Sequence, residues 1–171
     1  QLARDALAAG VVHPALLTLR AQDLQAQGRF ADALADLRRA VAMAPKDIVA
    51  LNGMGLCLQA MDKFAEARQA FDAALAIRAD FPPALFNRGH TSELMGDLDA
   101  ARGDYEAALA LDPNFPEPAA RLASLAARRR DWGVVRTRAA QALAIDADQS
   151  PALLALATAD MEEGDLAGAK Q

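Results

Sequence analysis

Histidine and cysteine, which often act in catalysis and metal binding, are rare in this chain. The 171 residues include one cysteine, Cys57, and two histidines, His13 and His90. These three side chains do not have metal-ligand spacing, and His90 lacks a Ser, Cys or His partner at usable spacing for catalysis. The sequence therefore predicts a chain that is not an enzyme and has no metal or cofactor. Cys57 is predicted to be a small core residue, because free cysteine packs as a small apolar side chain.

Arginine is the residue type here that could bind an anion or a nucleic acid. Residues 128–130 are three consecutive arginines, but Asp131 follows them and the whole chain carries a net charge of −5. The run also falls at a predicted helix C-terminus, where cations are favourable to the helix dipole. Non-specific nucleic-acid binding needs a basic surface. We therefore expect no nucleic-acid partner.

The elements that position these side chains follow one period of 34 residues. The period is set by five predicted turn residues: Gly28, Asp62, Gly96, Arg130 and Gly164. It divides a single predicted domain into repeats 14–47, 48–81, 82–115 and 116–149, with a partial repeat over 150–171 and the end of a preceding repeat over 1–13. Fixed periods of this length are typical of helical repeat arrays.

Each repeat reads as two helices joined by a tight turn. All eight prolines fall at the predicted ends of helices, where proline is tolerated, and none falls in a predicted helix interior. Glycine recurs at position 15, which predicts a turn between a helix over positions 1–14 and a second over positions 16–31. Aromatic residues make up only 5% of a chain rich in alanine, which favours helices over strands. The sequence predicts an all-α fold with at least nine helices and no strand.

A second internal pattern concerns charged residues at positions that should face the core. Position 7 holds an arginine only in the two repeats that have an aspartate at position 23. The pattern predicts two structural ion pairs, Arg20–Asp36 and Arg88–Asp104, because a buried arginine needs a carboxylate to offset its desolvation. The alternative is an arginine that binds a ligand.

The repeat resembles the tetratricopeptide repeat over the whole chain. Small residues at positions 8, 20 and 27, large ones at 17 and 24, and proline at 32 carry the resemblance, and residues 105–113, YEAALALDP, are close to its second helix. The fourth repeat departs most, with Ala139 at position 24 and Arg130 at position 15. The resemblance implies a right-handed α-solenoid of stacked helix–turn–helix repeats that acts as a scaffold and binds a protein or an extended peptide.

The resemblance also implies that the first helix of each repeat lines a concave groove. The candidate groove residues on these helices are Asn52, Leu56, Gln59, Phe86, Asn87, His90, Glu93, Arg121, Ser124 and Arg128. Amide side chains suit a peptide backbone, an aromatic ring suits an anchoring side chain, and arginines suit a carboxylate. The alternative is that these are solvated polar positions. The clamp that binds chaperone tails is not favoured, because Glu117 stands where that subfamily has a lysine.

A second hypothesis makes this chain the helical recruitment or regulatory region of a larger enzyme. The sequence begins inside one helix pair and ends inside another, and it resembles the N-terminal repeat region of bacterial sulfotransferases that carry tetratricopeptide repeats. Helix pairs at the ends of an array expose apolar faces, so we expect possible self-association through Leu2, Leu7, Leu153, Leu156 and Leu166. No signal peptide or membrane-spanning segment is predicted, which favours the cytoplasm.

Overall fold

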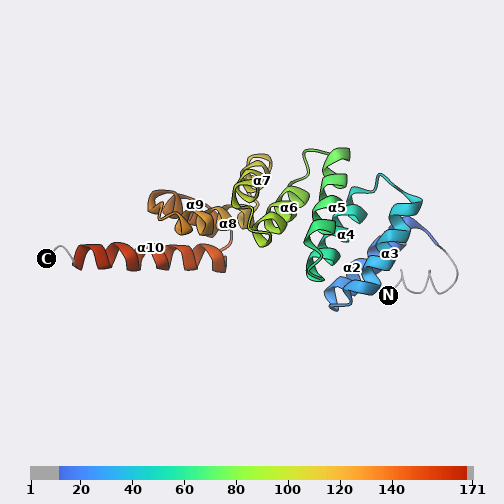
Figure 1. Cartoon of the computed structure of the whole chain (residues 1–171), viewed down its shortest axis with the longest axis horizontal. Helices are drawn as coiled ribbons and strands as arrows, with labels where there is room; N and C mark the ends of the chain where they lie inside the picture. Colours follow the sequence, from blue (N-terminus) through green and yellow to red (C-terminus); the bar gives the residue numbers. More distant parts are fainter. Residues whose placement is uncertain (1–11, 169–171) are drawn as a thin grey trace. The chain divides into compact units, whose positions relative to one another are not determined.

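The structure is a computed structural model that describes residues 12–168, with side chains described for 12–164. Within these residues it contains nine α-helices and no strand, as the sequence predicts (Figure 1). The predicted repeat end over residues 1–13 lies almost wholly outside the described part of the chain. No helix within that part is long and apolar enough to cross a membrane.

Each complete repeat contributes a first helix of 13 residues and a second helix of 14. The first helices are α2 (Pro14–Ala26), α4 (Ile48–Ala60), α6 (Pro82–Leu94) and α8 (Pro116–Arg128). The second helices are α3 (Phe30–Met43), α5 (Phe64–Ile77), α7 (Leu98–Leu111) and α9 (Trp132–Ile145). A last helix, α10, runs over Ser150–Gly168. The predicted helix boundaries agree with these bounds to within one residue.

The turn between the two helices has the same backbone conformation in every complete repeat. Position 15 has a positive φ throughout: 72° at Gly28, 58° at Asp62, 85° at Gly96 and 57° at Arg130. This left-handed residue lets the next backbone N–H reach back across the last helical turn, as when Arg29 donates to the Leu24 carbonyl at 2.8 Å. Asp62 and Arg130 adopt this conformation although they are not glycine. The packing of the helix pair therefore fixes the turn and offsets the cost of a positive φ, which is about 1 kcal/mol for such residues.

The predicted turn at Gly164 is wrong. α10 continues through this residue to Gly168 instead of folding back into a second helix. Glycine can adopt helical φ as well as positive φ, so the residue permits either outcome. In the complete repeats, a second helix of 14 residues buries its apolar face, and this burial offsets the conformational cost of the turn.

The helices form two compact units, and Figure 1 shows their chain order. The first unit ends at Gly96 and contains α2–α6, and the second begins at Asp97 and contains α7–α10. In the first unit, α3 packs on α2 and α4, and α5 packs on α4 and α6. In the second unit, α8 packs on α7, α9 and α10. The boundary falls inside the third repeat, so a single continuous domain remains a prediction.

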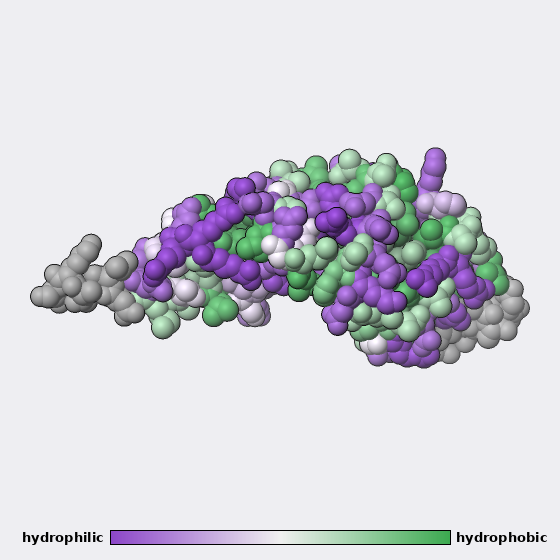
Figure 2. Space-filling view, in the orientation of Figure 1, coloured by the Kyte–Doolittle hydropathy of each residue, from purple (hydrophilic) through white to green (hydrophobic). Residues whose placement is uncertain are grey.

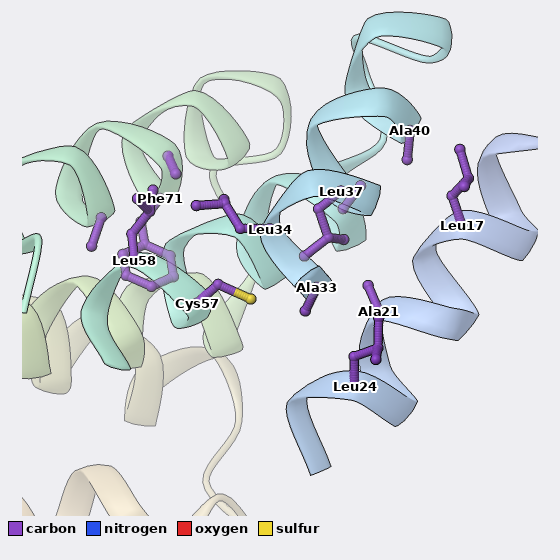
Figure 3. Close-up of a cluster of buried hydrophobic side chains, with 13 residues drawn as sticks. Leu17, Ala21, Leu24, Ala33, Leu34, Leu37, Ala40, Cys57, Leu58 and Phe71 are labelled. Atoms are coloured by element: carbon purple, nitrogen blue, oxygen red, sulfur yellow. The ribbon is translucent and has the colours of Figure 1, made fainter. Parts of the chain in front are cut away.

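The core of the first unit joins α2, α3, α4 and α5. Figure 3 shows Leu34 of α3 pointing toward Leu58 of α4 and Phe71 of α5, and all three side chains are buried. Phe71 lies against Gly55 of α4, where an added Cβ would stand only 2.4 Å from the ring. The close approach of the aromatic ring therefore requires glycine at position 55. The packing of Phe71 offsets the low helix propensity of this glycine.

Candidate functional site

The first helices of the first unit lie next to one another in the order α2, α4, α6. On α4, Asn52, Leu56 and Gln59 are spaced by four and three residues, which places them on one face. On α6, Asn87 and His90 share a face in the same way. All five side chains are partly exposed, and Figure 2 shows polar and apolar residues side by side over the surface of the molecule. The structure therefore brings together most of the predicted groove residues that belong to this unit.

Two asparagines join α4 to α6. The side-chain NH2 of Asn87 donates to the Oδ1 atom of Asn52 at 3.1 Å. This bond leaves the NH2 of Asn52 and the side-chain carbonyl oxygen of Asn87 without a partner within the described residues. One donor and one acceptor therefore face solvent side by side, and a peptide group offers the complementary acceptor and donor.

Gln59 forms the second link between the same helices. Its Nε2 atom lies 3.1 Å from Nδ1 of His90 and donates to Oγ1 of Thr91 at 3.3 Å. Thr91 is fully buried and its hydroxyl donates to the backbone carbonyl of Asn87 at 2.8 Å. These bonds fix the orientation of Gln59 and His90. We call Asn52, Gln59, Asn87 and His90 the amide surface.

A shallow apolar depression adjoins the amide surface. It has a volume of about 490 Å³ and lies between the C-terminal halves of α2, α4 and α6 and the first residue of α3. Its lining residues are Gln25, Phe30, Leu56, Gln59, Ala60, His90 and Leu94. The ring of Phe86 stacks on His90 with ring centroids 6.3 Å apart. The depression contains no Asp, Glu, Lys or Arg and suits an uncharged side chain.

The remaining predicted groove residues behave differently. Arg121, Ser124 and Arg128 lie on α8 in the second unit. The hydroxyl of Ser124 donates to the carbonyls of Ala120 and Pro151, both at 3.3 Å, so it ties α8 to α10. Glu93 lies on α6 and is partly exposed. A single groove that includes the α8 residues remains a prediction.

One of the two predicted ion pairs is present between α2 and α3. Nε and Nη2 of Arg20 donate to the two carboxylate oxygens of Asp36, both at 2.5 Å. Asp36 is 4% exposed, while the Arg20 side chain is 30% exposed. The hydrogen bond to Asp36 raises the pKa of Arg20, although burial partly opposes this rise. Both partners serve to join two helices, which is the structural role that the sequence predicts.

The other predicted arginine has a partner that the sequence analysis missed. Nη1 of Arg88 on α6 donates to Oδ1 of Asp72 on α5 at 2.8 Å. Asp104 is buried and belongs to the second unit, so its pairing with Arg88 remains a prediction. Asp72 is sixteen residues before Arg88, as Asp36 is sixteen residues after Arg20. Asp104 lies sixteen residues after Arg88, so spacing alone does not distinguish Asp72 from Asp104.

Two further residues of the site were not among the predicted groove positions. Thr91 connects Gln59 to the α6 backbone, and Phe30 closes one side of the depression from α3. Thr91 occupies the repeat position of Cys57 and Leu125, both buried. Thr91 could have been recognised because it is a polar residue at a core position. Phe30 could not, because it belongs to a second helix and the groove was predicted only on the first helices.

Two arginines of the run at residues 128–130 pair with carboxylates. Arg129 donates to Oδ1 of Asp99 at 2.8 Å, and Arg130 pairs with Glu162 on α10. These arginines therefore help to hold the second unit together.

Within residues 12–168, no three His, Cys, Asp or Glu side chains are grouped so that they could hold a metal ion.

Cys57 lies in the core of the first unit, as predicted. It is fully buried, and the amide of Gln25 donates to its Sγ atom at 3.1 Å. Burial raises the pKa of the thiol, although the hydrogen bond from Gln25 acts in the opposite direction. The same amide donates to the Gly53 carbonyl at 2.9 Å. The Gln25 amide therefore contacts two residues of α4 and helps to hold α2 against α4.

The chain matches one family in comparisons of sequence. Two family models, both described as tetratricopeptide repeat, match residues 24–86 and 82–115, which together make up more than half of the chain. A search of curated proteins found no match. Nothing in the family descriptions names a sulfotransferase.

Solved structures of repeat proteins superpose on the chain at low sequence identity. A thermophilic TPR protein from Thermus thermophilus does so with a TM-score of 0.79 and 21% identity, over 94% of this chain and 88% of its own. A tetratricopeptide repeat protein from Parabacteroides merdae gives 0.74 and 19%, over 89% of this chain and 60% of its own. The chain thus spans less than two thirds of the Parabacteroides protein.

A third structure is the first TPR domain of Spaghetti (RPAP3), bound to the HSP90 peptide SRMEEVD. It gives a TM-score of 0.65 and 23% identity, over 66% of this chain and 92% of its own. At these identities the three structures establish the fold alone, and they confirm the predicted all-α fold of stacked helical repeats. With its 34-residue period, its left-handed turn residues and these two matching family models, the chain belongs to the tetratricopeptide repeat family.

Proposed function

We propose that this chain is a non-enzymatic scaffold that binds an extended protein segment along the first helices of its repeats. The amide surface carries the proposal. Asn52 and Asn87 present a donor and an acceptor side by side, already held in place by the hydrogen bond between them. Pre-organised side chains lose little conformational entropy when a peptide binds. The bound HSP90 peptide in the Spaghetti domain shows that this fold can serve such a role in another protein.

The depression beside the amide surface supplies the second feature that a peptide site needs. Peptide recognition combines backbone hydrogen bonds, which give affinity, with pockets for side chains, which give specificity. The depression is lined by Leu56, Ala60 and Leu94 and contains no Asp, Glu, Lys or Arg. The proposed partner segment therefore places an apolar side chain there and a peptide group against Asn52 and Asn87. We expect affinity in the micromolar range, on the order of −8 kcal/mol.

Charged residues extend the proposal beyond the amide surface. The predicted groove includes Arg121 and Arg128, and Glu93 and Glu117 lie at other positions of the first helices that are expected to face it. Mixed charges of this kind suit a segment that carries both signs better than a strongly basic or acidic tail. Contact between one partner segment and the α8 residues remains a prediction.

The double variant Asn52→Ala/Asn87→Ala is expected to weaken peptide binding about tenfold or more, because two backbone hydrogen bonds are lost. Peptides selected from a random display library on the intact chain provide the ligands, and fluorescence anisotropy measures their dissociation constants. Asn114→Ala is the matched control, since it removes an exposed asparagine in the loop between α7 and α8. Arg121→Ala separately tests the contribution of α8. Equal affinities for the double variant and the original chain would contradict the proposed site.

The enzyme hypothesis has less support. No feature of the described residues favours a role as the recruitment region of a sulfotransferase, and that idea rests on sequence resemblance alone. A catalytic domain elsewhere in a longer protein would be compatible with a binding role for these repeats.

Self-association is a second, separate prediction. On α10, Leu154 and Met161 are 70% and 71% exposed, and Leu153 is 48% exposed. Leu156 is partly buried, while Leu2, Leu7 and Leu166 lie outside the residues whose side chains are described. We expect concentration-dependent sedimentation that Leu154→Glu/Met161→Glu reduces, because charge disfavours burial of this face. Leu111→Glu, at a leucine on α7 that is 48% exposed, is the control. A sedimentation coefficient that stays constant up to high concentration would count against it.

A further inference from the structure

The second unit contains a cavity built from helices that do not contribute to the amide surface. It has a volume of about 490 Å³ and is bordered by α7, α8 and α9. Leu122, Leu125 and Ala126 of α8 form its apolar floor, and Val134 of α9 contributes one wall. Arginines from all three helices line the remainder. A volume of this size, with an apolar floor and charged groups around it, is compatible with a small-molecule site.

Comparison with the first unit shows why this cavity exists. There, Leu34 and Leu58 occupy positions 21 and 11 of their repeats and fill the corresponding space as buried core residues (Figure 3). In the second unit the same repeat positions hold Arg102 and Ala126. The side chain of Arg102 is 48% exposed and pairs with Asp99 at 3.6 Å. Two leucine side chains are therefore missing from the space between α7 and α9.

Glycine on α9 enlarges the same space. Gly133 lines the cavity, and a Cβ added there would meet only the Oδ1 atom of Asp131, at 3.8 Å. The carboxylate of Asp131 caps α9 by accepting a hydrogen bond from the Val134 backbone N–H at 3.2 Å. This carboxylate also lines the cavity and offsets part of the arginine charge around it.

The arginines give the cavity an excess of positive charge. Asp99 is shared by Arg129, at 2.8 Å, and Arg102, at 3.6 Å, so one carboxylate serves two guanidinium groups. Arg138 is partly buried, and Nη1 donates to Oε1 of Gln141 at 3.2 Å. Within residues 12–164 no carboxylate pairs with Arg138. Glu106 also lines the cavity but is exposed on α7. A single negative charge at the cavity is thus complementary to the groups that surround it.

We propose that this cavity binds a small carboxylate with an apolar body, of the kind represented by a medium-chain fatty acid. The hydrocarbon chain lies on Leu122, Leu125 and Ala126, and the carboxylate meets the guanidinium of Arg138. The cavity is built by α7, α8 and α9, whereas the amide surface belongs to α4 and α6. Its occupancy is therefore independent of the proposed peptide site.

Isothermal titration calorimetry on the intact chain tests this proposal with decanoate, used below its micelle concentration. Decanol and decyltrimethylammonium provide the same chain without charge and with the opposite charge. We expect decanoate to bind most tightly. Arg138→Gln is expected to weaken decanoate binding about tenfold, because a charge-assisted hydrogen bond is lost. Arg38→Gln, at an exposed arginine of α3, is the matched control and should have no effect.

Two filling variants test the location of the site. Arg102→Leu and Ala126→Leu restore the leucines of the first unit and are each expected to reduce decanoate binding below detection. Arg68→Leu, at the same repeat position as Arg102 but on α5, is the matched control. Circular dichroism shows whether each variant is folded, and either folded filling variant suffices. Undiminished binding by a folded filling variant, equal binding of the three probes, or no decanoate binding at millimolar concentration would overturn the proposal. None of these results would affect the peptide site.

Discussion

Replacing Asp36 by alanine is expected to lower the free energy of unfolding by about 3 kcal/mol. The carboxylate is 4% exposed and accepts two hydrogen bonds from Arg20. Alanine at this position removes the counter-ion of the Arg20 guanidinium. The Arg20 side chain is only 30% exposed, so water cannot fully replace the lost carboxylate. The cost is at the lower end for buried pairs, because the remaining exposure of Arg20 lets water solvate part of the charge. Urea denaturation followed by circular dichroism measures the change.

Two further variants distinguish the effect of losing the Arg20–Asp36 ion pair from the effect of losing an aspartate side chain. Arg20→Leu/Asp36→Leu removes both charges and should cost much less than Asp36→Ala, since no buried charge remains. Asp32→Ala, on the same helix, removes a carboxylate that is 56% exposed and paired with Arg29, and should cost about 0.5 kcal/mol. A double-mutant cycle that shows no coupling between Arg20 and Asp36 would exclude the pair as a stabilising contact.

The pH dependence of this pair follows from the arginine. The pKa of Arg20 is raised in the folded state, chiefly by its hydrogen bond to Asp36. A group whose folded pKa is raised stabilises the fold fully below its unfolded pKa, and the contribution disappears as pH rises through the folded pKa. For an arginine that range is strongly alkaline. The contribution of Arg20 should therefore be unchanged between neutral pH and moderately alkaline pH.

The local features of the fold could be predicted from the sequence because proline and glycine act through the backbone. Prolines at the helix starts and a recurrent residue at position 15 give the period, the helix boundaries and the turns. Asp62 and Arg130 follow the same turn without being glycine, which only the 34-residue register reveals. Gly164 shows the limit of this reasoning, since glycine at the same repeat position continues a helix there.

Long polar side chains were harder to place. A first helix packs against the second helix of its own repeat and that of the preceding repeat, so an arginine on it has two possible partners. Arg20 contacts Asp36 in its own repeat, whereas Arg88 contacts Asp72 in the preceding one. Repeat positions predict which helices meet, but the rotamers of arginine and aspartate decide which carboxylate is reached.

The groove residues were predictable as a face of α4 and α6, but their mutual hydrogen bonds were not. Helical spacing places Asn52, Gln59, Asn87 and His90 on exposed surface, where each could equally have faced only water. The Asn52–Asn87 bond depends on the separation between α4 and α6. Sequence gives the residue types at such contacts, while distances of a few tenths of an ångström decide which bonds form.

Gly55→Ala is expected to destabilise the chain by about 3 kcal/mol, although alanine has the higher helix propensity. An added Cβ would lie 2.4, 2.5 and 2.7 Å from three ring atoms of Phe71. The ring is fully buried and cannot move without displacing the core. The sequence shows the same compensation: repeats with glycine at position 8 have an aromatic residue at position 24, while the first repeat has Ala21 and Leu37.

Gly103→Ala is the matched control for this prediction. Gly103 lies inside α7, and a Cβ added there would meet no atom within 4 Å beyond its own helix. The substitution should therefore raise the free energy of unfolding by up to about 1 kcal/mol through helix propensity alone. The double variant Gly55→Ala/Phe71→Leu should recover part of the loss caused by Gly55→Ala, because leucine frees the space that the new methyl group needs. Urea denaturation of the three variants measures these differences. If Gly55→Ala were as stabilising as Gly103→Ala, contact with the Phe71 ring could not be the reason for glycine at this position.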